Sequence, residues 1–123
     1  MNANPYQTYK QQSVLTMTPG QILLAVYDEL IKQIHFAKLG FEENDNSAIN
    51  RSLQKSQQIV HVLQGTLNFD YSISAGLNDL YDYFDFVFRN TNMKKDSVGL
   101  DDVLSMVVEL REAFAEADKL ARK

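Results

Sequence analysis

Two histidines are the first residues of this 123-residue chain to test for chemistry. Helical bundles with a carboxylate di-metal centre place the motif Glu-x-x-His on two helices, so that both side chains project inward. Three residues before His35 and His61 the sequence has Lys32 and Gln58, and neither supplies the glutamate ligand. The sequence also places no serine or cysteine beside either histidine as a nucleophile. We therefore interpret both histidines as surface or packing residues and expect no metal site.

Three aspartates at three-residue spacing, Asp79, Asp82 and Asp85, are a second candidate site, in this case for a cation. Acids with this spacing lie on one side of a helix, and a solvated helix face explains them more simply. The chain has no cysteine, its five glycines stand apart without a phosphate-binding loop, and it has no Gly-x-Ser-x-Gly motif. The sequence thus predicts a binding protein with no catalytic residues and no cofactor.

The overall composition limits the kinds of partner. The formal net charge is −4 and the sequence pI is about 5.0, whereas nucleic-acid binding calls for a basic face. The N-terminal residues have neither the basic start nor the apolar core of a signal peptide. No apolar run approaches the roughly 18 residues of a membrane span. We expect a cytoplasmic, single-domain protein that binds no nucleic acid and does not insert into a membrane.

The elements that position these residues are helices. The only prolines are Pro5 and Pro19, so the region after Pro19 can form long helices without a proline break. Turn-like segments at 43–47, 68–72 and 92–99 divide this region into helical stretches at about 19–42, 48–67, 73–91 and 100–121. Short connections make neighbouring helices antiparallel. The predicted fold is all-α: an antiparallel up-down-up-down four-helix bundle at 19–123, preceded by an extended N-terminal arm at 1–18.

Helix starts and core faces follow from residue type and period. Thr18 is expected to cap the first helix, with Pro19 in its first turn, and Asp70 or Ser72 is expected to cap the third.

On each helix, apolar residues recur at the helical period and define the expected core. These residues are Leu23, Tyr27, Leu30, Ile34, Ala37, Phe41, Ile49, Leu53, Val60, Leu63, Leu67, Ile73, Leu77, Leu80, Tyr81, Phe84, Val87, Phe88, Leu100, Val103, Leu104, Val107, Leu110, Phe114, Ala117 and Ala121.

The helices carry more apolar side chains than one core stripe each can hold. The stretch LNDLYDYFDFVF at 77–88 has Tyr83 beside the core line and Phe86 pointing away from it. Scattered surface hydrophobics and wide helical cores are ordinary explanations for single residues. Over four helices, we interpret the excess as a surface that receives another helix. The other helices add Ile22, Val26, Phe36, Ile59, Val62, Met106 and Val108.

The N-terminal arm is polar but carries Tyr6, Tyr9 and Val14. We hypothesise that these side chains cover part of the apolar surface in the free protein and leave it when a partner binds. With this arm included, the predicted partner-binding residues are Tyr6, Tyr9, Val14, Ile22, Val26, Ile59, Val62, Leu63, Tyr83 and Phe86.

Four blocks of the sequence are distinctive. They are NPYQTYKQQSV at 4–14 with TPGQILLAVYDELI at 18–31, LNDLYDYF at 77–84, NTNMKKD at 90–96 and VVELREAF at 107–114. In this order and spacing, over essentially the whole chain, they resemble the flagellar export chaperones of the FliS family. Three residues depart from that family's usual pattern: Glu29 stands in place of glycine, Phe84 in place of methionine and Phe114 in place of tryptophan.

The resemblance implies a bundle that binds the disordered C-terminal region of newly made flagellin in the cytoplasm. The bound region would form short helices around the chaperone, which would prevent premature polymerisation and keep the subunit competent for the flagellar type III export apparatus. No metal, nucleotide or cofactor is implied, and the chaperone is expected to be a monomer or a weak homodimer. Two alternatives stay open: a self-associating helical bundle without a flagellin client, and a metal-dependent helical enzyme.

Overall fold

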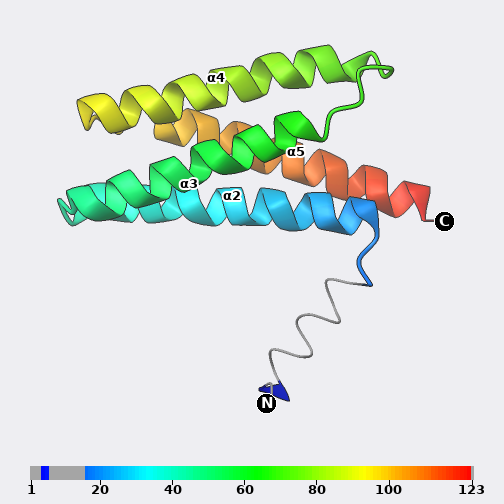
Figure 1. Cartoon of the computed structure of the whole chain (residues 1–123), viewed down its shortest axis with the longest axis horizontal. Coiled ribbons are helices and arrows are strands. Elements are labelled where there is room, and N and C mark those ends of the chain that lie inside the picture. The colour runs from blue at the N-terminus through cyan, green and yellow to red at the C-terminus, as the bar shows by residue number, and fades with distance from the viewer. Residues whose placement is uncertain (1–3, 6–15, 123) are drawn as a thin grey trace.

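The computed structural model describes residues 4–5 and 16–122. Four α-helices form the body of the molecule: α2 (Pro19–Glu42), α3 (Asn46–Gly65), α4 (Ile73–Lys94) and α5 (Leu100–Ala121). The described residues contain no strand. The helices run alternately in opposite directions and pack as an antiparallel bundle (Figure 1). The predicted fold class is confirmed.

Local capping sets the start of α2 where the sequence predicts it. Thr18 Oγ1 accepts a hydrogen bond from the Gln21 backbone N–H at 3.2 Å, and Gln21 Oε1 accepts one from the Thr18 N–H at 3.0 Å. This reciprocal pair is a capping box, and Pro19 in the first turn loses no hydrogen bond. Two otherwise free N–H groups are therefore satisfied where the arm joins α2.

Both ends of α3 and the end of α4 differ from the prediction by two or three residues, and the other helix boundaries agree with it. α3 begins at Asn46, before the predicted residue 48, because Asn44 adopts a left-handed φ of 55° and Asp45 caps the first turn. Ser72 precedes α4 as predicted but makes no side-chain cap hydrogen bond. α4 also continues into the predicted turn, and Lys95, with a φ of 52°, ends it.

The helices contact one another unequally. α2 packs against α3 and α5, α3 packs against α4, and of these four neighbouring pairs α4 and α5 have the smallest contact. The start of α2, the α3–α4 connection and the end of α5 lie at the same end of the bundle (Figure 1). The antiparallel α2–α3 pair is thus the most extensive helix contact, and its seam runs nearly the length of the molecule.

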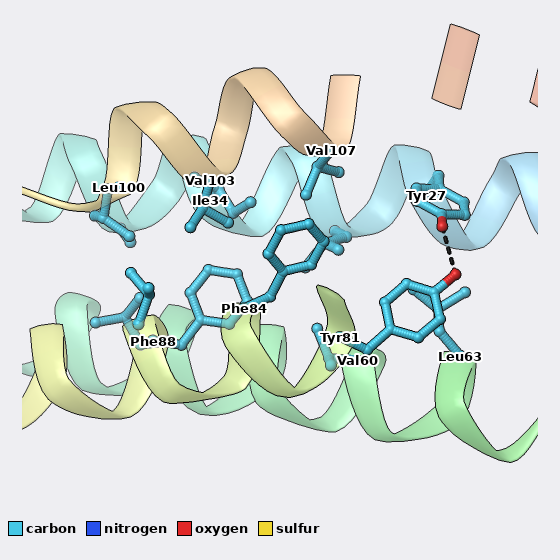
Figure 2. Packing of buried hydrophobic residues seen from close by; sticks show 14 of the residues in the cluster. Tyr27, Ile34, Val60, Leu63, Tyr81, Phe84, Phe88, Leu100, Val103 and Val107 are labelled. Atoms are coloured by element: carbon cyan, nitrogen blue, oxygen red, sulfur yellow. Dashed lines mark hydrogen bonds between the residues drawn. The ribbon is translucent and has the colours of Figure 1, made fainter. Parts of the chain in front are cut away.

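The helical period predicts most of the core correctly. Phe84 and Phe88 of α4 project inward to meet Ile34 of α2 and Val103 of α5 (Figure 2). Leu23, Phe41, Leu67, Leu80, Leu104, Leu110 and Phe114 pack around the buried cluster and are themselves partly buried. The core therefore joins all four helices into one body.

A buried pair of tyrosines lies at one end of this core. The hydroxyl oxygens of Tyr27 on α2 and Tyr81 on α4 are 2.5 Å apart and share a hydrogen bond (Figure 2). Burial raises the pKa of both phenols, so both hydroxyls stay protonated at neutral pH. The ring of Phe114 on α5 lies against Tyr27, with centroids 5.5 Å apart. This cluster ties three helices together.

Three residues expected in the core lie outside it. Ile73, the first residue of α4, is 63% exposed. Ala117 and Ala121, near the end of α5, are also exposed. Helix phase gives the direction of each side chain, but a helix end has fewer neighbours to cover it than the middle of a helix. The prediction was wrong at these positions for that reason.

Asp85 was also predicted wrongly, as a solvated acid. Its side of α4 faces α3, and the residue is only 9% exposed. Arg89 Nη2 donates to Oδ2 at 2.5 Å, Gln57 Nε2 donates to Oδ1 at 3.1 Å, and His61 Nε2 lies 3.3 Å from Oδ1. The other two aspartates of the triplet are exposed, as expected. The three acids do not converge on a cation site; Asp85 instead joins α4 to α3.

Candidate functional site

An apolar groove lies between the first half of α2 and the second half of α3. Two cavities of about 460 and 440 Å³ form it. They share Ile22, Val26 and Val62, so they make one continuous surface, which we call the apolar section of the α2–α3 groove. Its walls are Met17, Pro19, Ile22, Leu23, Ala25, Val26, Glu29, Gln58, Ile59, Val62, Leu63 and Thr66.

Helical spacing explains why these side chains meet. Ile22 and Val26 are one turn apart on α2, and Ile59 and Val62 are one turn apart on α3. Both helices already use another stripe for the core, so these residues form a second stripe along the outer seam. Ile22 is 46% and Val62 is 56% exposed. An apolar seam between two helices can accept the apolar stripe of a third helix.

Five of the predicted partner-binding residues line this groove: Ile22, Val26, Ile59, Val62 and Leu63. Leu63 differs from the other four, because it is 1% exposed and belongs to the core. It forms part of the floor, while the other four offer accessible apolar surface. The structure thus brings together residues of α2 and α3 that are more than 30 positions apart in the sequence.

The remaining predicted residues are not in the groove. Tyr83 and Phe86 lie on α4, where they are 43% and 60% exposed. Neither contributes to the walls of the α2–α3 groove. Tyr6, Tyr9 and Val14 lie outside the residues that the structure describes.

Met17 and Ala25 are among the wall residues of the apolar section that the sequence analysis did not predict. Met17 precedes the cap of α2, so helix phase does not apply to it, and it lines the groove where the arm joins the bundle. Ala25 is small, and its position between Ile22 and Val26 hides it among larger candidates. A test for small residues between exposed apolar ones would have found Ala25, since a small side chain deepens a groove.

Glu29 marks the end of the apolar section. Gln33 Nε2 donates to Glu29 Oε1 at 3.0 Å, and Lys32 Nζ lies 2.9 Å from Oε2. The hydrogen bond from Gln33, followed by the one from Lys32, lowers the pKa of Glu29, so the carboxylate is ionised at neutral pH. An ionised group at this rim favours a polar or basic side chain beside it over an apolar one.

Beyond Glu29 the seam opens into a smaller cavity of about 290 Å³. We call it the basic section of the α2–α3 groove, because Arg51 and Lys55 of α3 line it together with a single acid, Glu43. Phe36 and Leu39 of α2 supply its apolar surface. The remaining walls are Gln33, Gly40, Ala48 and Ser52.

Within the described residues, we also looked for a metal site and for a membrane-spanning helix. No group of three or more histidine, cysteine, aspartate or glutamate side chains within them is arranged to hold a metal ion. None of the described helices is both long enough and apolar enough to span a membrane. The α2–α3 groove is therefore the feature on which we base a function.

Comparison with known proteins gives the family. The model of the family described as "Flagellar protein FliS" matches residues 2–121. The flagellar secretion chaperone FliS of Bacillus subtilis (strain 168) is 36% identical over 120 residues, which cover 98% of this chain and 90% of that protein. The protein of the same name from Salmonella typhimurium is 23% identical over 113 residues, covering 89% and 84% of the two chains. The chain therefore belongs to the FliS family of flagellar secretion chaperones.

Proposed function

We propose that the protein is a cytoplasmic chaperone that binds the disordered C-terminal region of newly made flagellin as helices. In this proposal, binding prevents premature polymerisation and keeps flagellin competent for the flagellar export apparatus. The observation that carries the proposal is the apolar section of the α2–α3 groove, on a chain that belongs to the FliS family.

The dimensions of the groove suit a helix. From Pro19 to Glu29 the apolar section follows α2 for about 15 Å, which is close to three helical turns. Ordering a disordered client segment costs roughly 2–5 kcal/mol or more. Burial of about 200 Å² of apolar surface offsets about 5 kcal/mol, at 25 cal/mol per Å². An amphipathic helix that covers Ile22, Val26 and Val62 can reach this area.

Tyr83 and Phe86 supply a second contact in this proposal. Both rings are exposed on α4, away from the α2–α3 groove. A client region long enough to form several short helices can occupy the groove with one and lie over α4 with another. Tyrosine suits such a surface, because its ring is apolar and its hydroxyl remains hydrated in the free protein.

The N-terminal arm supplies a displaceable cover in this proposal. Met17 lines the apolar section, so the chain that carries Tyr6, Tyr9 and Val14 joins the bundle at the groove. We expect deletion of residues 1–14 to increase both the affinity for client and the binding of a dye that reports exposed apolar surface. If neither quantity changes, the arm does not cover the groove.

Calorimetric titration with a peptide spanning roughly the last 50 residues of the cognate flagellin tests the proposal. Val62→Asp places a charge in the groove at a residue that is 56% exposed. We expect it to weaken binding at least about tenfold, because a carboxylate replaces apolar contact area. Circular dichroism should record an unchanged helical fold.

Val98→Asp is the matched control, since Val98 is 82% exposed and lies outside the groove. We expect this variant to bind the peptide as the wild type does. Equal weakening by the two variants would mean that the groove is not the binding site. No binding of the peptide to the folded wild-type protein would contradict the proposed function as a whole.

A further inference from the structure

The apolar and basic sections of the α2–α3 groove form one continuous surface. Glu29 and Gln58 line the apolar section, and Gln33 and Lys55 line the basic section. Gln33 donates its hydrogen bond to Glu29 across the boundary, and Lys55 lies one turn before Gln58 on α3. A helix laid along the seam would therefore pass from one section directly into the other.

The two cations of the basic section have no salt-bridge partner among the described residues, although the charge of Lys55 contributes to the lowered pKa of Glu29. Both Arg51 and Lys55 are exposed. They are one turn apart, so both lie on the same face of α3. Among the described residues, Glu43 is the one acid that lines this section; Glu29, which is paired with Lys32, and Asp45, which accepts a hydrogen bond from the Ala48 N–H, lie beside it. The two cations that line the basic section outnumber its single lining acid, on a chain whose net charge is −4.

Apolar surface lies beside these cations. Phe36 is 48% and Leu39 is 47% exposed on α2, opposite Arg51 and Lys55 on α3. A helix in this section would place its apolar stripe on α2 and its polar flank toward α3. Acidic side chains on that flank would then lie next to Arg51 and Lys55.

The helix dipole adds a direction to this charge pattern. The carboxyl end of a helix carries partial negative charge and is stabilised by nearby cations. The basic section lies at the carboxyl end of α2 and the amino end of α3. A helix that places its own carboxyl end there runs parallel to α2 and antiparallel to α3.

From these observations we propose that the basic section is a specificity site for acidic side chains in the last turns of the client helix. The client helix thus enters the groove in one orientation: its apolar turns contact Ile22 and Val62, and its acidic carboxyl-terminal turns contact Arg51 and Lys55. From Ile22 to Leu39 this path is about 26 Å long, which is about five turns of helix. The inference rests on the proposed function, because it concerns the helix that the same groove would hold.

Two synthetic peptides of about five helical turns test the orientation. They share one apolar stripe and one composition, and differ only in whether three glutamates occupy the carboxyl-terminal or the amino-terminal turns. We expect wild-type protein to bind the peptide with carboxyl-terminal glutamates about three- to tenfold more tightly, since exposed ion pairs are individually weak. The preference should shrink as salt concentration rises.

The double variant Arg51→Gln/Lys55→Gln assigns this preference to the basic section. We expect the ratio of the affinity for the peptide with carboxyl-terminal glutamates to the affinity for the other peptide to fall about three- to tenfold from its wild-type value. Because each peptide is compared with itself on two proteins, differences in the peptides' own helix stability cancel. Lys94→Gln/Lys119→Gln is the matched control: it removes the same charge from two lysines outside the groove, and the ratio should stay as in wild type.

The outcomes separate this inference from the proposed function. If the flagellin C-terminal peptide binds the wild type and the Arg51→Gln/Lys55→Gln variant equally, and the ratio of the two synthetic-peptide affinities is the same for both proteins, the specificity site is refuted while the chaperone function stands. Preference for amino-terminal glutamates would refute the proposed orientation. Failure of the wild type to bind the flagellin peptide would contradict the function and the inference together.

Discussion

At the scale of single residues, the Tyr27–Tyr81 hydrogen bond is the contact whose removal is easiest to interpret. Tyr81→Phe leaves the Tyr27 hydroxyl buried without its partner, which costs about 1–3 kcal/mol. We expect the free energy of unfolding in urea to fall by that amount. The double change Tyr27→Phe/Tyr81→Phe should cost less than the two single changes added together, because it leaves no unpaired hydroxyl.

Tyr83→Phe is the control for this experiment. Tyr83 is 43% exposed, so the loss of its hydroxyl should change the unfolding free energy by less than about 0.5 kcal/mol. Equal losses in the Tyr81→Phe and Tyr83→Phe variants would mean that the buried hydrogen bond contributes nothing specific.

The same pair predicts how stability depends on pH. Burial raises the pKa of Tyr27 and Tyr81 above the usual value of 10.0. Above that pH the unfolded chain loses phenolic protons that the folded chain keeps. The unfolded state then binds fewer protons, so the unfolding free energy falls as pH rises. This contribution is complete below about pH 10 and is lost above it.

Urea midpoints at about pH 9 and about pH 11 measure this effect. We expect the midpoint of the wild type to fall more between these values than that of the Tyr27→Phe/Tyr81→Phe variant. Parallel decreases in the two proteins would show that other groups cause the alkaline loss of stability.

At the scale of helices, the start of α2 packs closely on the end of α5 through Gly20. A Cβ atom at this position would overlap the carboxylate of Asp118, which Arg122 Nε holds at 3.2 Å. We expect Gly20→Ala to cost about 1 kcal/mol in thermal or urea unfolding, although alanine favours helix. Adding Asp118→Ala should recover part of that loss, because the overlap disappears.

Gly76→Ala is the matched control in a helix without such a neighbour. Nothing lies within 4 Å of the Cβ that would be added at Gly76 in α4. We expect this variant to be more stable by about 0.5–1 kcal/mol. If Gly20→Ala stabilised the protein to the same extent, the close approach of α2 and α5 would be contradicted.

Helix phase explains both the successes and the failures of the sequence-based prediction. It placed Ile34, Val60 and Phe84 in the core because the middle of a helix in a four-helix bundle has neighbours along its whole inner side. It failed at Ile73 because the phase of a side chain does not reveal where a neighbouring helix ends. It failed at Asp85 because the partners that satisfy this acid come partly from α3, far away in sequence.

Part of the candidate site could be predicted from the sequence, as part of the core could. The sequence indicated which apolar residues exceed the core, among them Ile22 and Val62. It could not indicate that these two meet in one groove while Phe86 lies elsewhere, since that depends on which helices are neighbours. The basic section was not predicted at all, because Arg51 and Lys55 are ordinary helix-surface residues until Phe36 is seen opposite them.

At the scale of the whole molecule, the state of the free protein distinguishes a chaperone from a self-associating bundle. A second copy could cover the apolar section of the groove just as a client helix could. We expect sedimentation at micromolar concentration to give a monomer, or a weak homodimer that dissociates when flagellin peptide is added. A stable dimer that excludes the peptide would favour the self-associating bundle.

The central claim is that the C-terminal region of flagellin folds as a helix in the α2–α3 groove. Its most direct test is a nuclear magnetic resonance measurement on the complex of methyl-labelled protein with the flagellin peptide. We predict helical chemical shifts in the bound peptide and nuclear Overhauser contacts from its side chains to the methyl groups of Ile22, Ile59 and Val62. A bound peptide that stays unfolded, or that contacts Val98 and none of these methyl groups, would contradict the account.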